Sequence, residues 1–282
     1  MSTFAIASVV MKIVDDENDQ FTSLADFAVD GSTPADITVF VKPCASIEKP
    51  QSGILINEGI MWVHNRDACN MFSLYVCTES TGEPVFKVDI ASDWKEAVVY
   101  YLKNKLDGEY ALTGPVGEVL FRTILLFRKG LCIHASALIC ENKGIIFAAP
   151  SGTGKTTQSE MWKSFKNARI INGDRAALGI CDKTPFVYGS PWSGSSGAFS
   201  NSSAPLEAVI VLEQAQANEL HRLDSKVAVS MLLPRCFLPY FDERLMTLAI
   251  NNLSSIIAST PVYLLKCRPD KEAVELVYKC LL

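Results

Sequence analysis

Short apolar runs separated by polar turns recur through the first 105 residues of the chain. Apolar and polar positions alternate most clearly over 85–90, and polar turns interrupt the pattern at 65–67 and 81–83. Such runs predict short strands, and alternation predicts a sheet with one face toward water. We expect a β-rich N-terminal lobe over residues 1–105, with a short helix at 23–29 and strands at 4–13, 37–41, 54–57, 61–64, 72–77, 85–90 and 98–102.

The pattern changes after a polar segment at 105–109, which we interpret as a linker. Helical spacing follows from Pro115 to Gly130. Pro269 breaks the chain before the last helical stretch, and Asp270 is either its cap or an acidic residue of its first turn. We predict a second domain over 106–282, of α/β class with a mixed sheet and C-terminal helices. Its expected strands are 131–140, 144–148, 168–171, 206–212 and 262–266, and its later helices are 155–164, 225–233, 243–257 and 270–280.

The stretch 149–157 reads Ala-Pro-Ser-Gly-Thr-Gly-Lys-Thr-Thr and joins a predicted buried strand to a predicted helix. A glycine-rich turn at a helix N-terminus is a phosphate cradle, because its N–H groups face an anion. In the usual Walker A motif, which begins with glycine where this chain has Ala149, the lysine reaches the β- and γ-phosphates and the next hydroxyl binds Mg²⁺. These roles fall to Lys155 and Thr156. We expect nucleotide contacts from Ser151, Gly152, Thr153, Gly154, Lys155, Thr156 and Thr157.

Asp174 follows the strand that comes directly after the predicted helix. So short a strand-helix-strand unit places the loop and Asp174 at the carboxyl ends of neighbouring parallel strands, where α/β sheets bind ligands. Asp174 could therefore join Thr156 in binding Mg²⁺. The alternative is an aspartate that caps a polar turn.

Composition narrows the choice of function. A net charge of −5 without a Lys/Arg-rich run argues against nucleic-acid binding. No apolar run is long enough to cross a membrane. Nine scattered cysteines predict free thiols in a reducing cytoplasm. His64, near Asp67 and Cys69, is more typical of a structural histidine. The glycine- and serine-rich segment 189–203, anchored by Trp192, either closes over a substrate or is mobile.

His134, the run 150–156 and Gly173-Asp174-Arg175 resemble the core of the HPr kinase/phosphorylase family. That family shares its nucleotide-binding core with the ATP-dependent phosphoenolpyruvate carboxykinases. The stretches 189–192, 203–206 and 212–214 are similar to HPr-kinase-like proteins, some of which phosphorylate a precursor peptide. The resemblance covers about residues 130–215. It implies a P-loop kinase-like core that uses ATP and Mg²⁺, with His134 near the transferred phosphate, Asp174 as a metal ligand, and a possible homo-oligomer.

Gly173 departs from the family, which has two consecutive aspartates here and uses the first as the base. Either His134 or another carboxylate such as Glu213 takes that role, or catalysis is lost. Arg175 could neutralise transition-state charge or form a surface ion pair. The main hypothesis is a kinase that acts on a serine or threonine of a peptide or protein, or on a small molecule. The others are a non-catalytic nucleotide-binding regulator or scaffold, and a carboxykinase-like lyase, whose additional ligands we cannot place.

Overall fold

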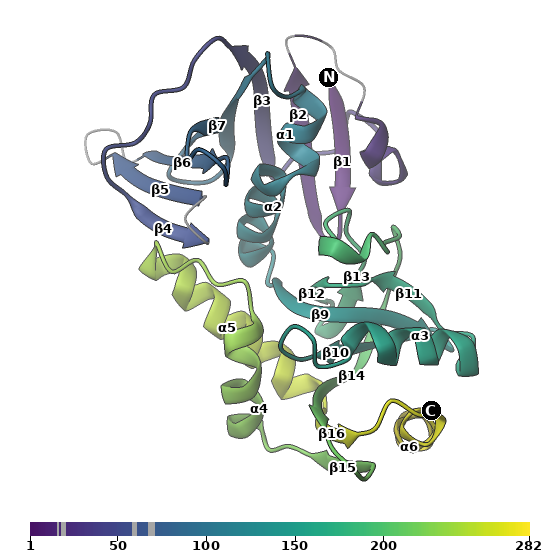
Figure 1. The fold of residues 1–282 in the computed structure, drawn as a ribbon. Coiled ribbons are helices and arrows are strands. Elements are labelled where there is room, and N and C mark those ends of the chain that lie inside the picture. Colours follow the sequence, from purple (N-terminus) through teal and green to yellow (C-terminus); the bar gives the residue numbers. More distant parts are fainter. Residues whose placement is uncertain (16, 18–20, 58–60, 67–70) are drawn as a thin grey trace. The chain divides into compact units, whose positions relative to one another are not determined.

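The computed structural model describes residues 1–282 except 16, 18–20, 58–60 and 67–70, and the side chains of 55–71 are not described either. The chain has a mixed α/β fold with two mixed β-sheets and C-terminal helices (Figure 1). It divides into two compact units. Unit 1 is Met1–Ile124 with Pro239–Glu243, and unit 2 is Leu125–Leu238 with Arg244–Leu282. The predicted division into domains after residue 105 stays a prediction.

Unit 1 is built on a mixed sheet in the order β1-β2-β3-β8-β7-β6-β5-β4. The pairs β2–β3 and β3–β8 are parallel, and the other pairs are antiparallel. The β-rich lobe predicted from the sequence is therefore present. The strands are β1 (Ser2–Ile6), β2 (Val9–Asp15), β3 (Ile37–Cys44), β4 (Ile54–Asn57), β5 (Met61–Arg66), β6 (Met71–Cys77), β7 (Pro84–Ile90) and β8 (Glu96–Leu102).

Three local predictions for this unit need correction. The strand expected at 4–13 is a hairpin of β1 and β2, because Ala7 adopts a positive φ of 54° in the turn between them. The helix expected at 23–29 is the 3-10 helix η1 (Thr22–Phe27). Part of the predicted linker belongs to helix α1 (Gly108–Thr113), which Asp107 caps by accepting a hydrogen bond from the Tyr110 N–H. The predicted helix at Pro115 is α2 (Pro115–Phe127).

Unit 2 contains the sheet that positions the candidate site. Its order is β10-β9-β12-β13-β14-β16-β15, with β11 also paired to β9 and β10 to β14. The predicted hairpin of β9 and β10 is confirmed, and its turn places Glu141 and Asn142 at positive φ, as a tight hairpin requires. The strands are β9 (Leu131–Cys140), β10 (Lys143–Ala148), β11 (Arg169–Asn172), β12 (Arg175–Cys181), β13 (Thr184–Tyr188), β14 (Ser203–Gln214), β15 (Glu219–Arg222) and β16 (Val262–Cys267).

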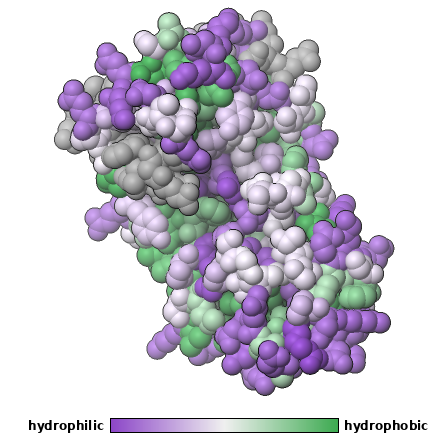
Figure 2. Space-filling view, viewed as in Figure 1, coloured by the Kyte–Doolittle hydropathy of each residue, from purple (hydrophilic) through white to green (hydrophobic). Residues whose placement is uncertain are grey.

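Helices α3 (Lys155–Lys166) and α6 (Lys271–Leu281) pack against each other and against this sheet. Their shared core includes Phe147 and Ile210 from the sheet, Trp162 from α3, and Val274 and Val277 from α6. The outer side of α6 is polar, and this region is strongly hydrophilic in Figure 2. The remaining helices are α4 (Ser225–Leu232), α5 (Glu243–Ser259) and the 3-10 helices η2 (Gly194–Ser196) and η3 (Leu233–Arg235). Within the described chain, no helix is long and apolar enough to cross a membrane.

Candidate functional site

The glycine-rich loop (residues 149–154) leaves the end of β10 and leads directly into α3. Gly152 and Gly154 have φ angles of 77° and 116°, which residues other than glycine rarely adopt. A Cβ atom on either glycine would meet no atom within 4 Å, so the space beside both is open. The first N–H groups of α3 have no acceptor within the helix. The loop therefore offers an anion both unpaired donors and room.

Burial accounts for the alanine at position 149, the first position of the glycine-rich loop. Its side chain is fully buried and belongs to the same core as Phe147 and Trp162. A glycine here would leave a methyl-sized gap in a close-packed interior. The departure at the first position is thus accommodated by packing and leaves the two positive-φ glycines of the loop untouched.

Lys155, the first residue of α3, is 7% exposed and folds back on the loop. Its Nζ donates hydrogen bonds to the carbonyl oxygens of Ala149 at 3.0 Å and Pro150 at 3.4 Å. Burial lowers the pKa of this ammonium group, the charge of Asp174 opposes that shift, and Arg235 adds to it. Asp174 and Arg235 therefore lie close enough to act on Lys155. An anion in the loop would relieve the cost of burying this charge.

The strands that carry the loop and Asp174 are parallel, but they are not neighbours as the sequence predicted. Strands β10 and β11 pair with opposite edges of β9, and both run antiparallel to it. The carboxyl ends of β10 and β11 therefore lie at the same end of β9, with one strand between them. His134 of β9 is at that end, because Ala148 pairs with Ala135 and Arg175 pairs with His134.

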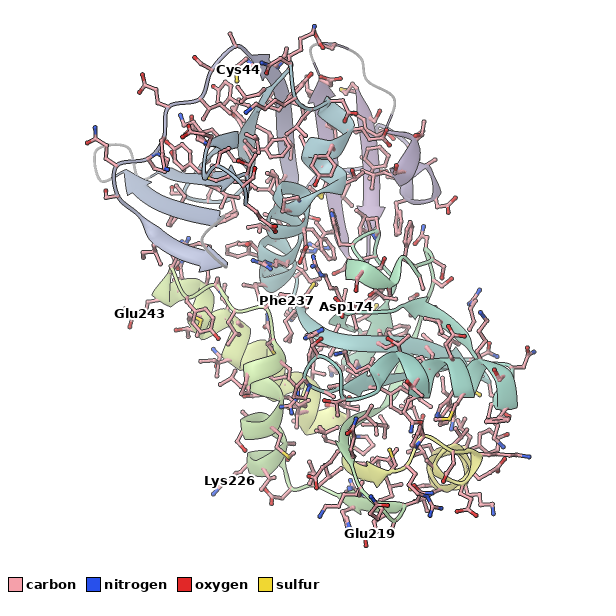
Figure 3. All side chains as sticks on the ribbon, viewed as in Figure 1. Cys44, Asp174, Glu219, Lys226, Phe237 and Glu243 are labelled. Carbon is pink, nitrogen blue, oxygen red and sulfur yellow. The ribbon has the colours of Figure 1, made fainter. Side chains whose placement is uncertain are left out.

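Asp174 and His134 form a direct pair at this sheet edge. His134 Nε2 lies 2.8 Å from Asp174 Oδ1, and Arg175 Nε lies 3.6 Å from Asp174 Oδ2. Phe237 and Asp174 are labelled in Figure 3. The ring of Phe237 lies 6.4 Å from the His134 ring and 5.8 Å from the Arg175 guanidinium. The side chains of His134 and Asp174 are 32% and 24% exposed, so this histidine is not a core residue. A carboxylate and an imidazole in contact can hold or pass a proton.

Asn172 holds the segment 189–203 against the end of β11. Its fully buried Nδ2 donates to the carbonyl oxygens of Ser190 at 3.1 Å and Trp192 at 3.0 Å. Its Oδ1 accepts from the N–H groups of Asp174 at 3.0 Å and Arg175 at 2.7 Å. One amide side chain thus connects the segment to the backbone of Asp174. The sequence left open whether this segment covers the site, and it is Asn172, a residue that we did not single out, that holds it in place.

A glycine is required at position 173, because the segment 189–203 packs against this residue. A Cβ atom at position 173 would lie 2.2 Å from Ser196 Oγ and 2.5 Å from Ser196 Cβ. The Gly173 N–H also donates to the Ala198 carbonyl oxygen at 2.9 Å. A Cβ atom on Gly194 would likewise lie 2.2 Å from Asp174 Oδ2. The tip of the segment (residues 193–197) therefore fills the space that an acidic side chain at 173 would need.

Two cavities flank the glycine-rich loop. One of about 770 Å³ is lined by loop and first-turn residues together with Gln214, Cys267 and Arg268. The other, of about 450 Å³, is lined by Pro150, Ser151, Glu213 and Arg235 among others. The first has the size of a small-molecule site. Glu213, the alternative base considered from the sequence, forms an ion pair with Lys266 at 3.7 Å.

The metal prediction depends on few ligands. Thr156 is exposed in the first turn of α3 and follows Lys155 in the sequence. The charge of Asp174 acts on the pKa of Lys155, so Asp174 lies near this turn. Among the described residues, no group of three or more His, Cys, Asp or Glu side chains could hold a metal ion. A hydroxyl and one carboxylate fit a cation that is also held by phosphates. The triplet of His64, Asp67 and Cys69 lies outside the described residues or side chains.

Sequence reasoning did not assign Arg235, Phe237 or Ser196 to the site. Arg235 and Phe237 follow α4, and Ser196 belongs to a serine-rich segment. The sequence contains no spacing signal that links these residues to the glycine-rich loop. The Cys236–Ile133 bridge and the hydrogen bond from the Phe237 N–H to the Cys132 carbonyl oxygen attach Arg235 and Phe237 to β9, and the Asn172 hydrogen bonds hold the segment of Ser196.

No protein-family model matches the chain, and no curated protein matches it. Among solved structures, the chain is similar to an HPr(Ser) kinase/phosphatase from Coxiella burnetii, with 10% sequence identity and a TM-score of 0.32. The match covers 53% of this chain and 87% of that chain. A TM-score this low indicates a distant structural relation and carries no functional weight.

Proposed function

We propose that the chain binds ATP with Mg²⁺ and transfers the γ-phosphoryl group to a hydroxyl group. The acceptor is a serine or threonine of a peptide or protein, or a small molecule. The observation that carries this proposal is the placement of the glycine-rich loop, with Lys155 behind it, at the same sheet edge as the Asp174–His134 pair. Phosphoryl transfer depends mainly on such positioning and charge stabilisation.

The loop and Lys155 would hold the β- and γ-phosphates. The N–H groups of the loop and of the first turn of α3 would supply donors, apart from that of Thr153, which donates to the Pro150 carbonyl oxygen. The Lys155 ammonium supplies a positive charge that is already desolvated. Arg235 lies close enough to Lys155 to affect its pKa and lines the cavity beside the loop, so it would add a second positive charge. The nucleoside would occupy the cavity of about 770 Å³.

Thr156 and Asp174 would hold Mg²⁺, since hydroxyl and carboxylate oxygens suit this ion. When bound, Mg²⁺ would neutralise the phosphate charge that develops during transfer. Asp174 also lies 2.8 Å from His134 Nε2, so the acceptor hydroxyl would lose its proton to His134. Arg175 orients the second oxygen of Asp174 from 3.6 Å.

A specific observation favours a second candidate, a nucleotide-binding regulator without turnover. Ser196 occupies the space of a side chain at position 173, so no carboxylate can stand there beside Asp174. General-base catalysis is worth on the order of 10²–10⁴-fold, and its loss would reduce transfer by that amount. The two candidates share nucleotide binding and differ only in chemistry.

Calorimetric titration with ATP and Mg²⁺, followed by incubation with γ-labelled ATP and serine- or threonine-containing peptides or small alcohols, tests the proposal. We expect binding that Lys155→Ala abolishes, and label on an acceptor. Lys163→Ala is the matched control, because Lys163 lies exposed on the same helix in a pair with Glu160. Binding without transfer or hydrolysis would leave only the regulator. Absence of binding would contradict both candidates.

A further inference from the structure

The tip (residues 193–197) brings a hydroxyl group of the chain itself to the candidate site. Gly173 immediately precedes Asp174 in the sequence. A Cβ atom on Gly173 would lie 2.2 Å from Ser196 Oγ. Gly194, two residues earlier, lies against Asp174 Oδ2 so closely that a Cβ there would be 2.2 Å away. Ser196 is exposed, and its neighbour Asp174 contacts His134 at 2.8 Å. A serine hydroxyl of the chain thus lies at the position next to Asp174, the candidate metal ligand.

We propose that Ser196 is a phosphate acceptor and that the chain phosphorylates its own tip. This inference rests on the proposed kinase function. In the reaction, Ser196 Oγ forms a bond to the γ-phosphorus of ATP, and the bond from that phosphorus to the bridging oxygen of ADP breaks. ADP leaves with the electron pair, and the serine proton passes to His134. The products are ADP and phosphoserine at position 196.

The segment is built so that its ends are held and its tip is not tied to the sheet by the Ser196 side chain. Asn172 fixes Ser190 and Trp192 on one side, and on the other the Ser200 N–H donates to the Ile171 carbonyl oxygen at 3.0 Å. Ser196 Oγ donates to the Ser193 carbonyl oxygen at 2.7 Å and accepts from the Ala198 N–H at 3.3 Å.

Both of these Ser196 hydrogen bonds are local to the segment. The Ser196 hydroxyl group can therefore leave its present position without breaking a hydrogen bond to β9, β10 or β11. Anchored ends keep the hydroxyl near Asp174, which gives it a high effective concentration compared with any acceptor in solution.

The same site would acquire a new charge after transfer. A phosphoserine carries about −1.5 to −2 charges at neutral pH and three acceptor oxygens. Next to Asp174 it would be repelled, and the absence of room at Gly173 prevents the larger group from returning to the place of the hydroxyl. Phosphorylation of Ser196 would therefore move the tip away from the Asp174–His134 pair and leave that pair open.

The test uses the full-length protein, treated with a phosphatase that is then removed, and incubated with γ-labelled ATP and Mg²⁺ without any other acceptor. We expect one phosphate per chain, located by peptide mapping on the segment 189–203. Ser196→Ala should remove this label, and Ser195→Ala, the matched control at the neighbouring exposed serine, should retain it. The first-order rate constant should not change with protein concentration, because donor and acceptor belong to one chain.

ATP binding measured on the same samples separates the two levels of inference. Binding together with hydrolysis or transfer to an added peptide, but without label on the tip, would overturn this inference and leave the proposed kinase function intact. Label that persists in Ser196→Ala, or a rate constant that rises with protein concentration, would also overturn it. Absence of ATP binding would overturn both.

Discussion

Gly173 and Ser196 share a space that only one side chain can fill. The Ser196 hydroxymethyl group occupies it, and the Gly173 N–H is used to hold Ala198. The consequence at the residue scale is that the glycine at position 173 and the position of the tip are one structural feature. A carboxylate cannot be introduced at 173 without displacing the tip.

Gly173→Asp should destabilise the protein. The new Cβ would lie 2.2 Å from Ser196 Oγ, and overpacking of this kind costs about 1–3 kcal/mol. Urea denaturation of the variant and the natural protein measures the difference in the free energy of unfolding. Ser196→Gly removes the obstructing side chain, so the double variant should recover most of the loss. Equal destabilisation by Gly173→Asp with and without Ser196→Gly would show that the two positions are not coupled.

His134→Gln should lower turnover while nucleotide affinity stays nearly unchanged. Glutamine can still donate a hydrogen bond to Asp174 Oδ1, but it cannot accept a proton, so the rate should fall on the order of 10²-fold. Steady-state kinetics and calorimetry measure the two quantities separately. His221→Gln is the control, because His221 on β15 is 56% exposed and pairs with Glu219. Equal activity of both variants would remove His134 from the proposed chemistry.

At the scale of elements, β9 determines which segments meet. Its two edges hold β10 and β11, so a strand that carries His134 lies between the glycine-rich loop and Asp174. The hairpin of β9 and β10 could be predicted because both strands are apolar and their turn is polar. Strands β12, β13 and β15 were not predicted. Strand β15 has four residues, of which three are polar, β13 has five residues and contains Pro185, and β12 is interrupted by Gly179. Pairing with longer strands stabilises them.

Helix α6 illustrates a boundary that local chemistry alone specifies. Asp270 was expected as its cap or as an acidic residue of its first turn, and it is the cap, because Asp270 Oδ1 accepts a hydrogen bond from the Ala273 N–H at 3.0 Å. This bond lowers the pKa of Asp270, with further contributions from Arg268 and Asn218. The carboxylate form is therefore the one that the fold prefers.

Asp270→Ala should lower the midpoint of thermal unfolding, and Asp270→Asn should lower it less, because asparagine also caps helices. The folded pKa is below that of an aspartate in an unfolded chain, about 3.9. The stabilisation is therefore fully present above that pH and is lost as pH falls through the folded pKa. Thermal scans from about pH 3 to pH 7 should show the difference between natural protein and Asp270→Ala shrinking only at the acid end. A difference that grows on acidification would contradict the assignment.

At the scale of the whole molecule, the two compact units give the proposed ligand a defined location. All residues of the glycine-rich loop, the Asp174–His134 pair and both flanking cavities belong to unit 2. Lys155 carries a buried charge there. A bound phosphate group should therefore stabilise unit 2 more than unit 1.

ATP with Mg²⁺ should stabilise unit 2 by about 2.7 kcal/mol at a concentration one hundred times its Kd. Hydrogen exchange followed by mass spectrometry should show slower exchange at the glycine-rich loop and at β11. The exchange rate of β7 in unit 1, where no ligand contact is expected, serves as the internal reference. Lys155→Ala should remove the effect, and Lys163→Ala should retain it. Unchanged exchange in unit 2 at saturating ATP would contradict the location of the site.

The sequence by itself determined the local features. Positive-φ glycines, a lysine after them, a helix cap and the β9–β10 hairpin depend on neighbouring residues, and their patterns are visible without a structure. The tertiary structure alone decided that β9 separates the loop from Asp174, that His134 contacts Asp174, and that Ser196 fills the space at Gly173. These contacts join residues far apart in sequence. They follow from strand pairing and from the buried Asn172 hydrogen bonds, which no local pattern encodes.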